Sequence, residues 1–458
     1  MDTEPFSSLT HDQCRQARLS RDSRFDGQFF IGVKSTGIFC RPICPARLPK
    51  EENVEYFSNK AQAVMSGYRP CLRCRPDSAP NSWAWKGTET TFSRAVKLLD
   101  AGELQQQSLV QLSERLGISD RYLRQLFERH LGMSPKQYAQ YQQLLFAKQL
   151  LHDSSMAVAD IAFAAGFNSV RRFNDAFKKI LKLTPSQVRG SRAGLQPENQ
   201  LKLAYKGTLN WQKVLDFYQR RAVEGIETIQ DNSYQRHVMI DGAPAWFQVI
   251  TLKGNVVSIT FELDKASQLQ SLVSGVRRML DLDADTDLIE RHLEQIATGV
   301  VQQKGLRLLG TWNLWEAGVR AIIGQQVSVN AAIKQLNTLA KALASNPDKQ
   351  LFFPTPEQIV ADDLACLRMP NSRKETLKRF ALFMIDNPEA QPEEWLALKG
   401  IGPWTVSYAC LRGQSRPNCL LEHDLVVKNH RAHFPTLTAE NVSPWGSYAT
   451  YHLWNYQQ

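Results

Sequence analysis

The sequence has no apolar run that approaches the length of a membrane-spanning helix. Its first residues also lack the apolar core of a secretory signal, because acidic residues and a histidine interrupt them, at Asp2, Glu4, His11 and Asp12. We therefore expect a cytosolic protein. In that compartment the eight cysteines do not indicate a framework of disulfides.

The composition is typical of a folded soluble protein. Hydrophobic residues make up 43% of the chain and charged residues 22%. A length of 458 residues exceeds one ordinary domain and predicts about three or four. The net charge of +10 favours a polyanionic partner, either nucleic acid or an anionic membrane surface. Because no membrane-spanning run is present, nucleic acid is the stronger expectation.

Two stretches have the composition of linkers. Residues 75–81 contain two prolines and no apolar periodicity, and residues 186–200 contain two glycines and a proline. They divide the chain into pieces of about 80, 100 and 260 residues. In the last piece, a β-hairpin is predicted over residues 246–263, and a helical period begins after about residue 300.

The middle piece contains an internal repeat. Residues 108–135 resemble residues 157–185, with glycine, phenylalanine and proline at corresponding positions: Gly117 and Gly166, Phe127 and Phe177, Pro135 and Pro185. Each copy predicts an amphipathic helix, a turn at the glycine and a second helix with exposed basic residues, which is a helix-turn-helix. The alternative is an ordinary helical bundle whose halves are alike by coincidence.

Four of the cysteines have the spacing of a metal site. They are Cys40, Cys44, Cys71 and Cys74, separated by three, 26 and two residues. Four thiolates close a tetrahedral shell around zinc, and short spacings within each pair suit the turns of such sites. The remaining cysteines stand apart and are expected to be ordinary thiols. On spacing alone, the predicted zinc site is purely structural.

The residues around this cluster resemble the N-terminal domain of the Ada family of methyl-accepting repair proteins. The match covers about residues 10–80 and is carried by FFIGVKSTGIFCRPICPAR (29–47) and GYRPCLRC (67–74). The resemblance implies that Cys40 is both a ligand of one zinc ion and a nucleophile. It would accept a methyl group irreversibly from a methylated backbone phosphate. Zinc would be structural and would also keep Cys40 as the reactive thiolate.

This chemistry would convert damage into a change of charge. Methylation of Cys40 removes one negative charge from the site, so binding to DNA phosphates should strengthen. The family's second methyltransferase domain has a Pro-Cys-His signature that this chain lacks. Direct repair of alkylated guanine is therefore not expected.

Residues 90–190 resemble the double helix-turn-helix DNA-binding domain of the AraC family. The match is carried by GIS at 117–119, GFNS at 166–169 and KLTP at 182–185. In such a domain the second helix of each copy lies in the major groove. The residues expected to face DNA are Arg121, Arg124 and Gln125 in the first copy and Arg171, Arg172 and Asn174 in the second. The alternative for these side chains is a solvated helix face.

A tight turn is predicted within residues 398–405, LKGIGPWT. Gly400 and Gly402 allow such a turn between a helix that ends near Leu398 and one that begins at Pro403. The N–H groups at the start of the second helix can hold a DNA phosphate without reading sequence. A Gly-x-Gly pattern is weak evidence on its own.

Residues 201–458 as a whole resemble the AlkA group of the helix-hairpin-helix glycosylases. Besides the turn, the match is carried by VRAIIGQQVSV (319–329), HDLVVK (423–428) and PWGSYATYHLW (444–454). The resemblance implies that Asp424 is the essential catalytic carboxylate, and that the flipped base is held by Trp404, Tyr408 and Trp454. The alternatives are a helix N-cap for Asp424 and ordinary core packing for the aromatic side chains.

The implied reaction suits these residue types. Alkylation at a ring nitrogen makes a purine cationic and a good leaving group, so its departure needs little acid catalysis. One preorganised carboxylate can then stabilise the oxocarbenium-like sugar and guide water. Electron-rich rings favour a cationic base that has been flipped out of the duplex.

Three differences from related glycosylases indicate which type of helix-hairpin-helix glycosylase to expect. Relatives that also cleave the strand have a Schiff-base lysine where this chain has Trp404, so a monofunctional enzyme is expected. Relatives with an iron–sulfur cluster have four C-terminal cysteines, whereas this chain has Cys410 and Cys419 there. Gln326 stands where the AlkA relatives insert a leucine into the DNA stack. It is a candidate DNA contact, and its role as a wedge stays open.

We therefore predict a multidomain, mainly α protein. Its parts are a small zinc-binding α/β domain (1–80), an AraC-type double helix-turn-helix domain (88–190), a small α/β domain (200–305) and an all-α helix-hairpin-helix glycosylase domain (306–458). The predicted function is alkylation repair coupled to regulation. A monofunctional glycosylase for alkylated purines would be fused to a methylphosphotriester-accepting sensor and transcription activator.

The expected partner is double-stranded DNA, at damaged sites and at a specific promoter, in the nucleoid of a bacterial cytoplasm. A contact with RNA polymerase stays open, and the chain is expected to be a monomer without a membrane partner. The rival function is a methylation-activated regulator whose glycosylase domain is not catalytic. A zinc-stabilised nucleoid protein would explain the charge but not the motifs.

Overall fold

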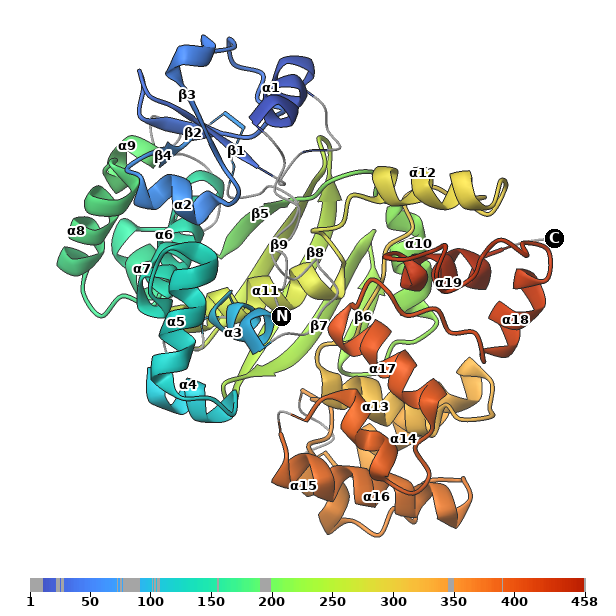
Figure 1. Ribbon diagram of the computed structural model, residues 1–458. Coiled ribbons are helices and arrows are strands. Elements are labelled where there is room, and N and C mark those ends of the chain that lie inside the picture. The colour runs from blue at the N-terminus through green and yellow to red at the C-terminus, as the bar shows by residue number, and fades with distance from the viewer. Residues whose placement is uncertain are drawn as a thin grey trace. The chain divides into compact units, whose positions relative to one another are not determined.

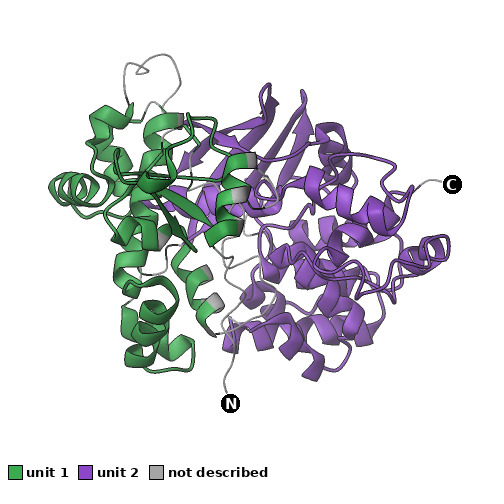
Figure 2. Cartoon of the chain, turned by 45° about the horizontal axis from the view of Figure 1, so that its top comes forward, with its two compact units in different colours: residues 1–198 green, residues 199–458 purple. Residues whose placement is uncertain are grey.

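The computed structural model describes residues 11–21, 25, 29–71, 73–74, 76, 91–100, 102, 104, 108–154, 156–189, 199–344, 350–388 and 390–456. The chain divides into two compact units, residues 1–198 and 199–458 (Figure 2). Within the described part of the chain, no helix has the length and apolar character needed to cross a membrane.

Of the two expected linkers, the structure describes part of the second but almost none of the first. The first, at 75–81, lies outside the described residues apart from Pro76. The second begins later than residue 186, because a short helix, α9, spans Pro185–Arg189. Thr184 and Gln187 stabilise its start through reciprocal hydrogen bonds between side chain and backbone, of 3.2 and 2.8 Å.

The N-terminal part of the first unit is built on a four-stranded sheet (Figure 1). Its elements are α1 (His11–Ser20), β1 (Phe30–Val33), β2 (Ile38–Cys40), η2 (Glu51–Asn53), β3 (Val54–Phe57), α2 (Lys60–Met65) and β4 (Arg69–Pro70). The strand order is β3-β1-β2-β4, with β2 and β4 parallel. This pairing brings the segment that ends at Cys40 beside the segment that leads into Cys71.

The second part of this unit is helical. Its elements are α3 (Thr91–Asp100), α4 (Leu109–Arg115), α5 (Asp120–Leu131), α6 (Pro135–Asp153), α7 (Val158–Ala164), α8 (Val170–Leu181) and α9. The predicted repeat is confirmed as two helix-turn-helix pairs, α4–α5 and α7–α8. Gly117 and Gly166 turn the chain at φ values of +69° and +80°, in the region that favours glycine. Phe127 and Phe177 are fully buried at corresponding places.

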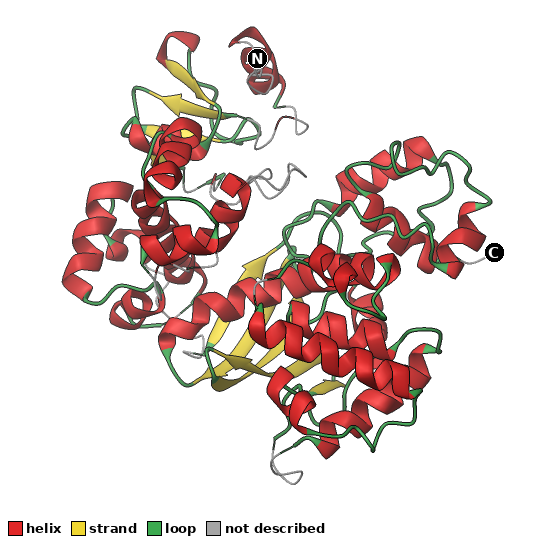
Figure 3. Ribbon diagram, turned by 60° about the horizontal axis from the view of Figure 1, so that its bottom comes forward, coloured by secondary structure: helices red, strands yellow, loops and turns green. Residues whose placement is uncertain are grey.

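The second unit contains a five-stranded antiparallel sheet (Figure 3). The strands are β5 (Gln200–Ala204), β6 (Glu227–Gln230), β7 (Ser233–Ile240), β8 (Ala243–Leu252) and β9 (Val256–Leu263), in the order β5-β9-β8-β7-β6. Strands β8 and β9 are the hairpin predicted over residues 246–263. Gly254 and Asn255 form its turn at φ values of +85° and +57°.

Helices make up most of the rest of this unit. They are α10 (Trp211–Gln219), η7 (Ala266–Gln268), α11 (Leu269–Met279), α12 (Thr286–Ile296), α13 (Leu314–Ile323), α14 (Val329–Ala342), α15 (Pro356–Ala361), α16 (Asn371–Asp386), η8 (Pro392–Ala397), α17 (Pro403–Gln414), α18 (Leu425–Arg431) and α19 (Gly446–Trp454). The mainly α, multidomain fold class is confirmed.

Small residues let the central helices approach closely. A Cβ atom at Gly318 of α13 would lie 2.3 Å from the ring of Phe380, and one at Gly413 of α17 would lie 2.8 Å from Leu314. Trp395 of η8 is fully buried in the same core. The position of α17 is therefore fixed by close packing against α13.

Four buried charged side chains join the sheet to α13. Glu227 of β6 and Glu316 of α13 each pair with both Arg236 of β7 and Arg320 of α13, at N–O distances between 2.5 and 3.0 Å. Because the two signs are equally represented, each buried charge has a partner of opposite sign.

Candidate functional site

The carboxylate of Asp424 accepts hydrogen bonds from four N–H groups. Its Oδ1 accepts from the backbone N–H of Val426 (3.1 Å) and Val427 (3.2 Å), so Asp424 is the N-cap of α18. The same oxygen accepts from Nε1 of Trp454 at 3.0 Å, and Oδ2 accepts from Nε1 of Trp404 at 3.1 Å. Since both oxygens accept, the arrangement suits the ionised carboxylate.

The aromatic residues singled out from the sequence gather around this carboxylate. Trp404 and Tyr408 lie one turn apart on α17, and their rings stack with centroids 5.2 Å apart. Trp454 reaches Asp424 from the end of α19. All three are partly exposed, unlike the fully buried Trp395. Helices α17, α18 and α19 thus bring one carboxylate and three accessible rings together.

Behind these rings lies a residue that the sequence reasoning missed. The guanidinium carbon of Arg412 lies over four rings, 4.6 Å from the centroid of Phe217, 4.9 Å from Trp454, 5.0 Å from Tyr451 and 5.9 Å from Tyr408. Arg412 is 2% exposed. The only signal in the sequence is an arginine within the otherwise uncharged stretch that ends α17. Phe217 comes from α10, nearly 200 residues earlier, and carries no signal.

The Gly-x-Gly turn is present with a different first helix. Instead of an α-helix ending near Leu398, the 3-10 helix η8 ends at Ala397. Gly400 has a φ of +97°, and a Cβ there would lie 2.1 Å from Oγ1 of Thr376. Gly402 precedes α17 with open space around it and no side-chain cap. Among the described residues, the first N–H groups of α17 therefore have no capping side chain from the N-cap position.

Gln326 lies in the loop between α13 and α14. It is exposed and has a φ of +56°, a conformation that costs a non-glycine residue about 1 kcal/mol or more. The preceding residue ties this loop to the turn, because Nε2 of Gln325 donates to the carbonyl of Gly400 (3.0 Å) and to Oγ1 of Thr405 (3.1 Å). The loop and the turn thus form one connected edge.

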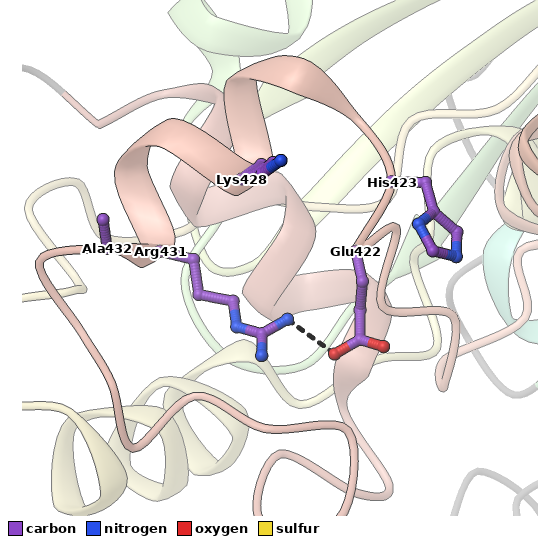
Figure 4. Close-up of a pocket in the computed structure, with 5 residues that line it drawn as sticks. All are labelled: Glu422, His423, Lys428, Arg431 and Ala432. Atoms are coloured by element: carbon purple, nitrogen blue, oxygen red, sulfur yellow. Dashed lines mark hydrogen bonds and ion pairs between the residues drawn. The ribbon is translucent and has the colours of Figure 1, made fainter.

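A polar hollow of about 440 Å³ lies at α18 (Figure 4). Its lining residues are Glu422, His423, Lys428, Arg431 and Ala432, and Arg431 pairs with Glu422 at 2.5 Å. None of the three aromatic residues lines it, so it is distinct from the carboxylate site. Leu425, beside Asp424, is 71% exposed.

The four clustered cysteines come together in the first unit. Their Sγ atoms all lie within 4.8 Å of one another. Backbone hydrogen bonds hold the segments that carry them, from Cys71 N–H to the carbonyl of Phe39 (3.0 Å) and from Cys44 N–H to that of Arg41 (3.1 Å). Three of the thiols are buried, and Cys40 is the more exposed one.

This donor set fits zinc. A tetrahedral zinc site with Zn–S bonds of about 2.3 Å needs sulfur atoms about 3.8 Å apart. Contacts with the thiols of Cys44, Cys71 and Cys74, together with burial, raise the pKa of Cys40 well above its ordinary value. A bound cation would reverse that effect, because it favours the thiolate form of every ligand.

The residues expected to read DNA are exposed on the second helix of each repeat. Arg121, Arg124 and Gln125 lie on α5, and Arg171, Arg172 and Asn174 lie on α8. Arg124 pairs with Asp120 at 3.1 Å. Among the described residues, the other three arginines form no ion pair, so their charges face solvent.

Three family descriptions match the chain. They are "Metal binding domain of Ada" at residues 13–77, "Helix-turn-helix domain" at 112–191 and "AlkA N-terminal domain" at 200–313.

Known proteins resemble the chain over its whole length or over parts of it. The "Probable bifunctional transcriptional activator/DNA repair enzyme AlkA" of Mycobacterium tuberculosis is 30% identical over 97% of this chain and 96% of its own. "DNA-3-methyladenine glycosylase 2" of Escherichia coli is 29% identical over 54% of this chain and 96% of its own. The "Bifunctional transcriptional activator/DNA repair enzyme AdaA" of Bacillus subtilis is 33% identical over 40% of this chain and 84% of its own.

The two glycines of the turn provide a matched pair of variants. Gly400→Ala should lower the free energy of unfolding by about 1–3 kcal/mol, because it forces a side chain into the left-handed region and against Thr376. Gly402→Ala should change it by only about 0.5 kcal/mol, since its φ of −113° suits any residue and the space is open. Urea unfolding of the full chain measures both. Equal effects would contradict the assigned turn geometry.

Proposed function

Because the chain belongs to the family of bifunctional transcriptional activator/DNA repair enzymes, we propose that it releases alkylated purines from DNA and carries its own damage sensor. We assign the sensor to residues 1–80, DNA reading to 88–190, and base release to 306–458 with the α/β domain 200–305 beside it. The observation that carries the catalytic assignment is the set of hydrogen bonds around Asp424.

The proposed reaction is hydrolysis of the bond between C1′ and the ring nitrogen of a cationic purine. The bond breaks with both electrons on the base, which leaves neutral, and positive charge develops on the sugar. Asp424 would stabilise that charge and guide the attacking water. Water then adds to C1′ and loses a proton to solvent. The fixed carboxylate favours the transition state over the ground state, which is the requirement for catalysis.

The surrounding residues would bind and position the DNA. Trp404, Tyr408 and Trp454 offer ring faces to a flipped cationic base. The uncapped N–H groups after Gly402 would hold a phosphate, with Gly400 shaping the turn. Gln326, at the exposed edge beside that turn, would contact the duplex where the base leaves it. Trp404 stands where strand-cleaving relatives have a Schiff-base lysine, so the enzyme would be monofunctional.

The rival function, a regulator with a non-catalytic glycosylase domain, explains less of this geometry. A helix cap needs only the two backbone contacts of Asp424, and many residues can supply them. The two indole donors come from separate helices and meet at the same carboxylate. A binding module gains nothing from a carboxylate held this firmly where phosphates approach.

Asp424→Asn should abolish most release of methylated purines. Asparagine can still cap α18, but it carries no charge, so the rate should fall about a hundredfold or more. DNA binding should hold or improve, because one negative charge near the phosphates is gone. Single-turnover release of 7-methylguanine from a duplex measures the first effect, and titration of the same duplex measures the second.

Two further variants distinguish an effect on the rate of base release from an effect on DNA binding. Glu422→Gln removes a neighbouring carboxylate outside the assigned site and should keep the parent rate. Gly402→Asp puts negative charge at the turn and should weaken DNA binding first. Release by the Asp424→Asn protein at the parent rate would make the regulator function the better account.

We also propose that Cys40 accepts a methyl group from a methylated backbone phosphate. Its support is the resemblance of the cluster and the partial exposure of Cys40 beside three buried thiols. Cys40, Cys44, Cys71 and Cys74 would hold one zinc ion, which when bound keeps the thiols ionised at neutral pH. The Cys40 sulfur would bond to the methyl carbon while the O–CH₃ bond breaks, leaving its electron pair on the phosphate oxygen as an ordinary diester.

This transfer would link damage to regulation. It removes one negative charge beside DNA, so binding to a promoter through Arg121, Arg124, Arg171 and Arg172 should tighten. A role as activator further implies contact with RNA polymerase. We expect the protein to act as a monomer at the nucleoid.

Exposure of the zinc-loaded full chain to methylated DNA should add one methyl group, located on Cys40 by mass spectrometry of its peptides. Cys40→Ser should abolish the transfer. The matched control is Cys14→Ser, because Cys14 is buried outside the cluster, and burial raises the pKa of its thiol to about 11. Cys14→Ser should accept the methyl group as the parent does. A methyl group on any other cysteine, or none, would contradict the assignment.

A further inference from the structure

Arg412 is a buried cation whose hydrogen-bond partners are uncharged groups. Its Nη1 donates to the carbonyl of Leu309 at 2.6 Å, and its guanidinium also forms a hydrogen bond with the side chain of Tyr451, while its Nε has no partner among the described residues. Among the described residues, no carboxylate forms an ion pair with it. The buried Arg236 and Arg320 differ, since each pairs with both Glu227 and Glu316.

A second arginine, Arg221, is partly buried and lies over one of these rings. The guanidinium carbon of Arg221 is 4.3 Å from the centroid of Phe217, the ring that Arg412 also contacts. Burial and then the charge of Arg412 lower the pKa of Arg221. The two cations therefore repel each other across Phe217, and among the described residues neither forms an ion pair that would neutralise it.

This charge lies directly behind the rings that surround Asp424. Arg412 is over Trp454, whose Nε1 donates to Asp424, and over Tyr408, which stacks on Trp404. A base held on these rings would be one ring layer away from the guanidinium. At such a short range, inside a desolvated region, a fixed charge acts strongly on any charge that the base gains or loses.

We propose that Arg412 is a specificity-determining residue that favours release of neutral purines relative to cationic ones; this rests on the proposed glycosylase function. A neutral purine leaves with both electrons of the C1′–N9 bond, so it becomes an anion and then takes a proton from water. Water also adds to C1′ and gives up a proton, so one water is consumed in total. The Arg412 charge stabilises the developing anion, which exists only in the transition state.

A cationic purine has the opposite relation to Arg412. It enters with a positive charge, which the guanidinium repels, and leaves neutral. The Arg412 charge therefore weakens its binding and gives no stabilisation to the departing base. Loss of the charge should therefore change the ratio of the kcat/KM values for the two classes of substrate. A packing defect would instead lower both kcat/KM values by a similar factor.

The test compares two variants on two duplexes, one with hypoxanthine as the neutral purine and one with 7-methylguanine as the cationic purine. Arg412→Met removes the charge and keeps an apolar side chain. It should lower kcat/KM for hypoxanthine about tenfold or more and leave that for 7-methylguanine equal or higher, with a lower KM. Arg412→Lys keeps the charge and should keep the parent ratio of the two kcat/KM values.

Several outcomes would overturn the proposal. They are an equal fall for both substrates in Arg412→Met, a changed ratio in Arg412→Lys, and a parent protein that releases 7-methylguanine but no neutral purine. If Arg412→Met does not fold, Arg412→Gln, which also removes the charge but keeps hydrogen-bond donors, takes its place in the same comparison with the same expected change of ratio. A parent protein that releases neither base would instead refute the glycosylase function itself.

Discussion

The convergence of four N–H donors on Asp424 is the constraint on which the rest of the second unit depends. Two donors belong to the start of α18, one to Trp404 near the start of α17, and one to Trp454 at the end of α19. A hydrogen bond tolerates only a few tenths of an ångström, so three helices must be placed together to that accuracy. The aromatic site exists because these helices meet at one carboxylate.

The placement of those helices is explained by packing and by buried charge. Gly413 lets α17 approach α13 closely, so α17 has little freedom to slide, and Gly318 lets α13 pack against Phe380 of α16. The network of Glu227, Glu316, Arg236 and Arg320 ties α13 to the sheet of the same unit. Removing one member would leave an unpaired buried charge, which typically costs about 3–5 kcal/mol. The small sheet domain therefore supports the site without supplying the carboxylate.

Sequence patterns correctly predicted those elements whose structure is determined by residues close together in the chain. The cysteine spacing, the paired glycines of the repeat and the hairpin around Gly254 each depend on residues close together in sequence. The resemblance to known families added Asp424 and its three aromatic neighbours, and the structure brings these side chains together. The start of the second linker was misplaced, because the reciprocal cap of Thr184 and Gln187 outweighs the glycines that follow.

The features that the sequence did not predict depend mainly on contacts between residues that are distant in sequence. Phe217 joins Arg412 across nearly 200 residues, and no local pattern indicates that contact. The helix before the turn is a 3-10 helix, which the periodicity of six residues cannot distinguish from an α-helix. Arg412 itself appears in the sequence as one arginine among many. Only its burial and the absence of an ion pair among the described residues mark it.

The central claim is that the indole donors hold Asp424 for catalysis, and Trp454→Phe tests it most directly. The variant removes the N–H that donates to Oδ1 at 3.0 Å and keeps an aromatic face. The control is Trp211→Phe on α10, which loses an indole hydrogen bond to the carbonyl of Asn232 in the turn between β6 and β7. In single-turnover release of 7-methylguanine, Trp454→Phe should be slower by about tenfold or more at unchanged DNA affinity, and Trp211→Phe should match the parent. Release at the parent rate by Trp454→Phe would contradict the account.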